Sequence, residues 1–173
     1  MNVQRKIIYE QRRQVLDGED LHTSIQSMIR FVIDGIVHAA FGEQKHLGDL
    51  SQFAEMMRHI EGVYLPEGSW KVTEDELKAL TKEQAEEKLM QLMDSFYAAK
   101  EQQYTPAVMR EVERVITLRV VDEYWMDHID AMDDLRQGIR LRAYAQEDPV
   151  IAYKREGFEM FEALTSAIKE EIV

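Results

Sequence analysis

The sequence contains no cysteine and few residues that favour turns. Its 173 residues include 0 Cys, 8 Gly and 3 Pro. Without cysteine the chain has no disulfide framework, no thiol nucleophile and no cysteine-ligated zinc site. A reducing compartment is therefore the expected environment. The scarcity of glycine and proline predicts few turns and long helices.

The sequence also lacks an apolar run long enough to cross a membrane. Its most apolar stretch, residues 31–41, is interrupted by Asp34 and His38, whereas a membrane-spanning helix needs about 18 or more apolar residues. Residues 1–13 are too polar and basic to form the apolar part of a secretion signal. We therefore expect a chain that can touch a membrane surface but does not cross the membrane.

The charge balance is acidic. The chain has 21 Lys and Arg against 33 Asp and Glu, so its formal net charge is −12. A nucleic-acid-binding protein needs a basic face, so the charge argues against nucleic acid as a partner. With 45% hydrophobic and 31% charged residues, the composition is typical of an amphipathic, mostly helical protein. The length suits one domain or two small ones.

Apolar residues recur at helical spacing along most of the chain. Thr73 with Glu76 and Thr81 with Gln84 have the spacing of a capping box, and Ser51 is a candidate cap for another helix. The first helix begins without a cap, as a segment cut from a longer helix would. The predicted helices cover residues 3–16 and 22–41, a segment from 51, short and long segments from 73 and 81, residues 107–142, and a segment from 149.

The longest periodic run predicts one helix over residues 107–142. Its apolar positions are Val108, Val112, Val115, Leu118, Val121, Trp125, Ile129, Met132, Leu135 and Ile139. Asp148 followed by Pro149 is a typical helix start. The apolar face predicted for the last helix contains Tyr153, Phe158, Phe161, Leu164, Ile168 and Ile172. Because the connection between these two helices is short, we expect them to be antiparallel neighbours.

Metal and catalytic sites receive little support. Glu19/His22 and Glu43/His46 have the Glu-x-x-His spacing of di-iron bundles. The first pair lies at the start of a helix and the second in a loop, so a solvated surface is the better interpretation of both. His128 has no carboxylate one helical turn away, and the sequence has neither a phosphate loop nor a nucleophile elbow. The chain alone is therefore expected neither to bind ATP nor to catalyse a reaction.

Two further patterns have a structural and a functional interpretation. The acidic residues of the long helix fit a solvated face better than a cation site; they are Asp122, Glu123, Asp127, Asp130, Asp133 and Asp134. Methionines at helical spacing fit a core better than an adaptable peptide-binding surface; they are Met28, Met56, Met57, Met90 and Met93.

Charge is unevenly distributed over the last two predicted helices. Residues 136–155 contain five basic and two acidic side chains, a net charge of +3, whereas residues 106–135 have 3 against 8, or −5, and residues 156–173 have 1 against 5, or −4. A basic end on an acidic protein is typical of a surface presented to a partner. Arg140 and Arg142 could instead stabilise the end of the long helix, but Lys154 and Arg155 begin the next helix, where the helix dipole disfavours them.

Several runs of residues resemble the SecA family of bacterial preprotein translocase ATPases. The longest is residues 121–146, Val-Asp-Glu-Tyr-Trp-Met-Asp-His-Ile-Asp-Ala-Met-Asp-Asp-Leu-Arg-Gln-Gly-Ile-Arg-Leu-Arg-Ala-Tyr-Ala-Gln. Asp148-Pro149, residues 153–158 and residues 4–13 continue the resemblance. Between residues 22 and 105, only the layout and Tyr64-Leu65-Pro66-Glu67-Gly68 agree.

The resemblance implies an all-α chain with three parts. Residues 1–21 would be the end of a long scaffold helix, residues 22–105 a helical wing domain, and residues 106–173 an antiparallel two-helix finger whose tip enters the SecY channel. It implies contact with the preprotein or channel at the fingertip through Arg142, Ala143, Tyr144, Ala145 and Gln146. The basic residues of the tip are Arg136, Arg140, Lys154 and Arg155.

The resemblance also implies a setting. The partners would be the remaining SecA domains, the SecYEG channel and a preprotein, with an anionic membrane surface as a further candidate and no nucleic acid. The location would be cytoplasmic, at the inner face of the bacterial plasma membrane. ATP and Mg²⁺ would bind to parts of the parent protein outside this chain, which itself would need no cofactor. Two rival hypotheses are a free-standing helical adaptor or chaperone that binds client peptides, and a ferritin-like metal enzyme.

Overall fold

The computed structural model of the chain describes residues 1–18, 20–142 and 148–173. Within these ranges the chain forms seven α-helices, and its only β-type pairing is an isolated bridge between Glu61 and Leu65. The protein is therefore all-α, as the sequence predicts. The helices belong to two compact units, one made of residues 1–22 and 110–172 and the other of residues 23–109.

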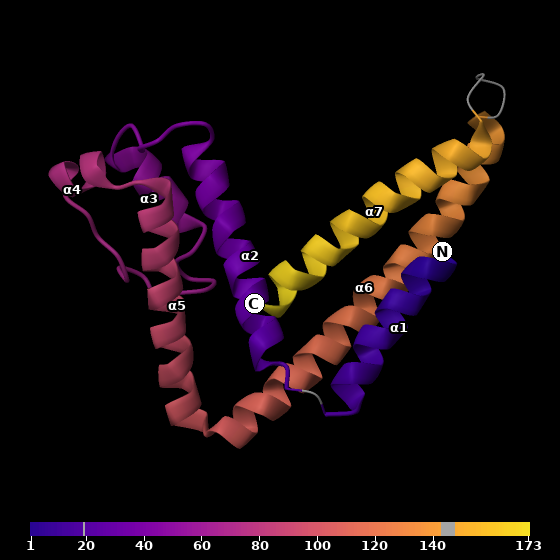
Figure 1. Cartoon of the computed structure of the whole chain (residues 1–173), viewed down its shortest axis with the longest axis horizontal. Coiled ribbons are helices and arrows are strands. Elements are labelled where there is room, and N and C mark those ends of the chain that lie inside the picture. Colours follow the sequence, from indigo (N-terminus) through magenta and orange to yellow (C-terminus); the bar gives the residue numbers. More distant parts are fainter. Residues whose placement is uncertain (19, 143–147) are drawn as a thin grey trace. The chain divides into compact units, whose positions relative to one another are not determined.

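Unit 1 contains three helices. They are α1 (Asn2–Leu16), most of α6 (Pro106–Arg142) and α7 (Pro149–Ile172). Figure 1 shows that α1 and α7 both run in the opposite direction to α6. The antiparallel arrangement of the two long helices is therefore as predicted, and α6 is continuous over 37 residues.

A buried apolar cluster holds the three helices together. Its members are Ile8 of α1, Val120, Val121 and Trp125 of α6, and Leu164 and Ile168 of α7. The cluster begins at Val120, and earlier apolar residues of α6 are more open, with Val112 and Val115 exposed over 42% and 51% of their surface. The predicted apolar face of α6 is thus buried only in its later part.

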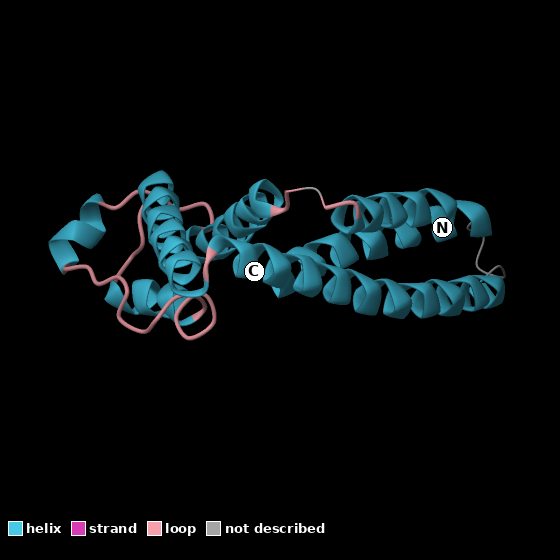
Figure 2. Cartoon of the chain, turned by 90° about the horizontal axis from the view of Figure 1, so that it is seen from below, coloured by secondary structure: helices cyan, strands magenta, loops and turns pink. Residues whose placement is uncertain are grey.

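Unit 2 contains the remaining four helices. These are α2 (His22–Phe41), α3 (Leu50–Arg58), α4 (Glu74–Ala79) and α5 (Lys82–Tyr104), with the first residue of α2 counted in unit 1. Figure 2 distinguishes these helices from the long loops between them. Buried residues of α2, α3 and α5 form most of the core, including Val37, Phe41, Met56 and Leu89.

Local capping explains where the helices of unit 2 begin. Thr73 and Thr81 each accept a hydrogen bond from the backbone N–H three residues on. The side chains of Glu76 and Gln84 in turn accept one from the backbone N–H of the cap, so both predicted capping boxes are confirmed. The predicted cap at Ser51 is wrong. Asp49 caps α3 instead, because its carboxylate accepts hydrogen bonds from the backbone N–H groups of both Ser51 and Gln52.

Candidate functional site

The predicted fingertip lies mostly outside the described residues. Ala143, Tyr144, Ala145 and Gln146 belong to the range 143–147, which the structure does not describe, and for Arg140 and Arg142 only the backbone is described. The contact residues inferred from the resemblance therefore remain a prediction. The structure places only the residues on either side of them.

The described basic residues beside the tip differ in their surroundings. Arg136 pairs with Asp133 one turn earlier on α6, while Lys154 and Arg155 lie exposed on the first turns of α7. Arg155 comes within 4.0 Å of Glu156. Asp148 accepts a hydrogen bond from the backbone N–H of Val150 at 2.8 Å, which confirms the predicted start of α7.

The outward face of α7 near the tip is apolar as well as basic. Val150, Ile151 and Phe158 are exposed over 59%, 60% and 60% of their surface. The prediction that Phe158 faces the core is wrong. The side of α7 that packs against α6 passes through Gly157 instead, which is buried, so the side chain of the next residue points away.

Two hydrogen bonds link the three helices of unit 1 through His128, Gln4 and Gly157, and these three residues are called the relay below. The Nε2 atom of His128 on α6 lies 3.0 Å from the Oε1 atom of Gln4 on α1. The amide nitrogen of Gln4 donates to the backbone carbonyl of Gly157 on α7 at 2.8 Å. His128 is only 5% exposed, and its burial lowers the pKa of the imidazole, with the amino group of Met1 adding to the effect.

A second polar contact joins α1 to α6. The guanidinium of Arg12 donates two hydrogen bonds to the Asp122 carboxylate, at 2.8 and 3.1 Å. Asp122, one of the acidic residues that the sequence assigns to a solvated face, is therefore paired with a basic side chain of α1. Both side chains remain partly exposed, so the pair is expected to add little stability.

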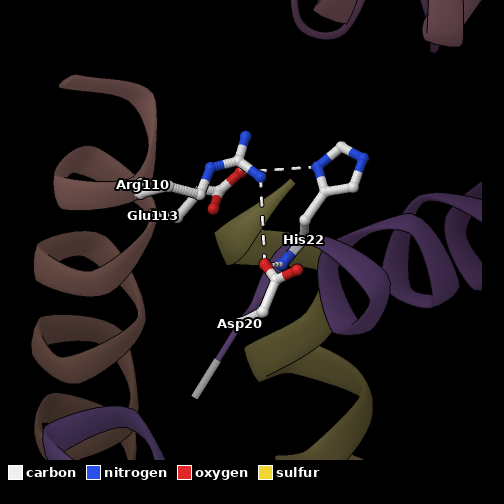
Figure 3. Close-up of polar contacts among 4 residues, drawn as sticks. All are labelled: Asp20, His22, Arg110 and Glu113. Carbon is white, nitrogen blue, oxygen red and sulfur yellow. Dashed lines mark hydrogen bonds and ion pairs between the residues drawn. The ribbon is translucent and has the colours of Figure 1, made fainter. Parts of the chain in front are cut away.

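The third polar group of unit 1, here called the Arg110 cluster, consists of Asp20, His22, Arg110 and Glu113. Figure 3 shows the four side chains converging. Arg110 lies 2.9 Å from the Glu113 carboxylate and 4.0 Å from that of Asp20, and His22 lies 3.9 Å from Glu113. The Asp20 carboxylate also accepts a hydrogen bond from the backbone N–H of His22 at 3.0 Å.

The Arg110 cluster holds together the two places where the chain leaves unit 1. Unit 1 ends at His22 and resumes at Arg110, and both residues belong to the cluster. Glu113 is 5% exposed, and this burial raises the pKa of its carboxyl group. A buried carboxylate is costly without a partner, so the guanidinium of Arg110 is the natural source of compensating charge.

These contacts change the interpretation of two histidines. His22 and His46 are both half-buried instead of fully solvated, because His22 faces Glu113 and the Nδ1 atom of His46 lies 2.9 Å from the carbonyl oxygen of Leu80. Arg110 places a positive charge beside the His22–Glu113 pair. No group of three or more potential metal ligands occurs in the described part of the chain.

The methionines of unit 2 favour the structural interpretation. Met56, Met57, Met90 and Met93 are buried, and Met28 is half-buried. They therefore offer little open surface for a client peptide.

None of the helices in the described ranges is both long and apolar enough to cross a bilayer.

Sequence reasoning did not find the relay or the Arg110 cluster. Gln4 and His128 are 124 residues apart in the chain, and Glu113 lies on the predicted helix without any local feature that distinguishes it from its acidic neighbours. The one available signal was His128 itself, a polar residue four positions from Met132 on the apolar face of α6.

Comparison with known proteins shows which family the chain is similar to. The whole chain, residues 1–173, matches the family model described as the SecA Wing and Scaffold domain. It is 46% identical to the protein translocase subunit SecA of Clostridium novyi (strain NT) over 178 residues, which is 100% of this chain and 20% of that protein. It is 47% identical to the protein translocase subunit SecA 1 of Clostridioides difficile (strain 630) over 173 residues, 100% of this chain and 19% of that protein. The chain thus spans about a fifth of the length of these relatives.

Proposed function

Because the chain belongs to the SecA Wing and Scaffold domain family, we propose that it is a non-catalytic, mechanical part of a protein-translocation motor. It would couple the ATP-driven motion of motor domains outside this chain to the movement of a preprotein through the SecYEG channel. The observation that carries this proposal is the continuous 37-residue helix α6. One uninterrupted helix packed against both α1 and α7 can transmit displacement along its axis with little bending.

The parts named by the resemblance fit this role. Residues 1–21 would be the end of the scaffold helix, residues 22–105 the wing, and residues 106–173 the two-helix finger. The division of the chain into residues 1–22 with 110–172 and residues 23–109 supports these limits. The fingertip would consist of residues 142–146, between the basic residues Arg136, Arg140, Lys154 and Arg155.

The partners follow from the same proposal. They are the remaining SecA domains, SecYEG and the preprotein, with an anionic membrane surface beside the channel, and the location is the cytoplasmic face of the bacterial plasma membrane. ATP and Mg²⁺ would bind to the parent protein and not to this chain. An upstream reading frame that encodes a phosphate loop would separate this proposal from the free-standing adaptor, which would have none.

Substitution of Tyr144 in the full-length protein tests the proposal. A tyrosine offers apolar area and a hydroxyl that can bond to any backbone, which suits a grip on chains of varied sequence. Tyr144→Ala should reduce preprotein transport several-fold while ATP hydrolysis continues, because the proposal puts the nucleotide site outside this chain. Tyr104→Ala is the matched control, since Tyr104 is an exposed tyrosine at the end of α5. Equal transport by the two variants would refute the fingertip assignment.

A further inference from the structure

Gln4 is the residue through which α1 contacts both other helices of unit 1 by hydrogen bonds. Its side-chain nitrogen donates to Gly157 at 2.8 Å, so its side-chain oxygen is left to accept. The partner of that oxygen, Nε2 of His128 at 3.0 Å, must then carry the proton. Both ends of the Gln4 amide are therefore used, one on α6 and the other on α7.

The surroundings of His128 restrict its movement. The imidazole lies against two aromatic rings, with centroids 5.5 Å from that of Trp125 and 5.8 Å from that of Phe161. It is also buried. These contacts and the hydrogen bond to Gln4 direct its Nε2–H group towards α1.

The other end of the relay is Gly157, a buried residue of α7 that lies against Met132 of α6. A Cβ atom at Gly157 would lie 2.8 Å from the terminal carbon of Met132, closer than real contacts allow. A side chain at this position would displace the end of Met132, and the Gly157 carbonyl oxygen has a second lone pair for Gln4. By contrast, a Cβ atom at Gly138 on α6 would meet nothing within 4 Å.

These contacts define the axial register of the helices. The burial of apolar side chains is not directional, whereas hydrogen bonds weaken steeply with distance and angle. The Arg12–Asp122 pair also joins α1 to α6, but it is 41% and 45% exposed and does not reach α7. Exposed ion pairs contribute little, so the relay, whose His128 and Gly157 ends are buried, is the stronger constraint.

We propose that Gln4 is a positioning residue that fixes the register of α1 against the α6–α7 hairpin, through His128 on one helix and the Gly157 carbonyl on the other. The inference rests on the proposed function, because register matters when a displacement of the scaffold helix has to reach the finger. Without the relay, α1 would remain packed on the hairpin but could shift along it. Part of each displacement of the scaffold helix would then not reach the finger.

The contact itself is tested on the chain by NMR. In the wild type, the His128 Nε2 proton should be visible and should exchange slowly with water. Gln4→Met, which keeps the length of the side chain, should accelerate that exchange at least about tenfold, as expected when a buried hydrogen bond is lost. Gln14→Met is the control, because Gln14 is an exposed glutamine on the same helix. Unchanged exchange in Gln4→Met would overturn the relay.

The positioning role is tested in the full-length protein. Gln4→Met should lower the amount of preprotein transported per ATP hydrolysed by about three- to tenfold, the size of effect expected for a lost coupling contact, while ATP hydrolysis stays near the wild-type rate. Gln14→Met should change neither quantity. Gln4→Glu, which keeps an acceptor for His128 but no donor for Gly157, should give an intermediate ratio.

The outcomes separate this proposal from the proposed function. A wild-type ratio in Gln4→Met, or a parallel loss of transport and hydrolysis in both Gln4→Met and Gln4→Glu, would overturn the positioning role. If Tyr144→Ala still uncoupled transport, the function of the finger would stand without the relay. If Tyr144→Ala behaved as wild type, the proposed function would fail independently.

Discussion

Trp125 is the largest side chain in the buried cluster of unit 1 and is 5% exposed. Trp125 lies on α6 and packs against α1 and α7, and its burial is as predicted from the apolar face of α6. Trp125→Ala should therefore lower the free energy of unfolding by about 3–5 kcal/mol, through lost burial and the cavity left behind. Met126→Ala should change it by less than about 0.5 kcal/mol, because Met126 is 67% exposed. Urea denaturation of both variants measures the difference, and similar losses would contradict the described packing.

His128 makes the stability of unit 1 depend on pH. Burial holds its pKa below the ordinary value of 6.5. As the pH falls below that value, the unfolded chain takes up a proton on this histidine while the folded chain resists, so protonation favours unfolding. The contribution of His128 to stability should therefore fall between pH 7.5 and 5.5.

Glu113 has the opposite effect, because its raised pKa favours folding at lower pH. A histidine variant isolates the contribution of His128. His128→Gln retains a donor for Gln4 and should lose less stability than the wild type over the same pH interval. His59→Gln, at an exposed position outside α3, should follow the wild type. Urea unfolding at the two pH values measures both, and a His128→Gln profile parallel to the wild type would exclude His128 as the source.

At the scale of elements, the Arg110 cluster links the connection before α2 to the start of α6. Arg110→Gln removes the positive charge beside the buried Glu113 carboxylate, and we expect a loss of about 1–3 kcal/mol, the usual cost of leaving a buried polar group without its partner. Arg114→Gln is the matched control, since Arg114 pairs with Glu111 on an exposed face of the same helix.

Hydrogen exchange locates the effect of Arg110→Gln. Backbone amides near residues 20–24 and 108–113 should exchange faster than in the wild type, because the cluster holds these two segments together. The Arg114→Gln variant should leave both segments protected. Equal protection in the two variants would show that Arg110 does not hold the segments.

The elements themselves were largely predictable from the sequence. Helical periodicity identified α1, α2, α5, α6 and α7, and the Thr73 and Thr81 capping boxes follow from short-range spacing. Local rules failed where two residues could satisfy them, as with Ser51 and Asp49. They failed again where packing decided the outcome, since periodicity alone cannot show that α7 approaches α6 through Gly157 with Phe158 outside.

The candidate site was less predictable than the fold. The relay joins residues 4, 128 and 157, and the Arg110 cluster joins residues 20–22 to 110–113. Contacts across such separations depend on how the helices pack, which a single sequence does not record. The basic flanks of the tip, in contrast, are visible in the sequence because Arg136, Lys154 and Arg155 are close along the chain or in the predicted hairpin.

At the scale of the whole molecule, charge distinguishes the hairpin tip from the rest of the chain. Residues 136–155, around the hairpin tip, carry +3, so the rest of the chain carries −15 of a net charge of −12. The tip is thus distinguished by charge, and the exposed Ile151 and Phe158 of α7 beside it add apolar surface. These features favour a surface that meets a partner at one end of unit 1.

The most direct test is a cross-link from the tip to a moving substrate. In the full-length protein, Tyr144 is replaced by a photoreactive phenylalanine analogue, and a preprotein is stalled in the channel before irradiation. Cross-links from position 144 to the preprotein or the channel are expected, and the same analogue at Tyr104 should give none. Cross-links from position 104 but not from position 144 would contradict the proposal that the hairpin tip contacts the translocating chain.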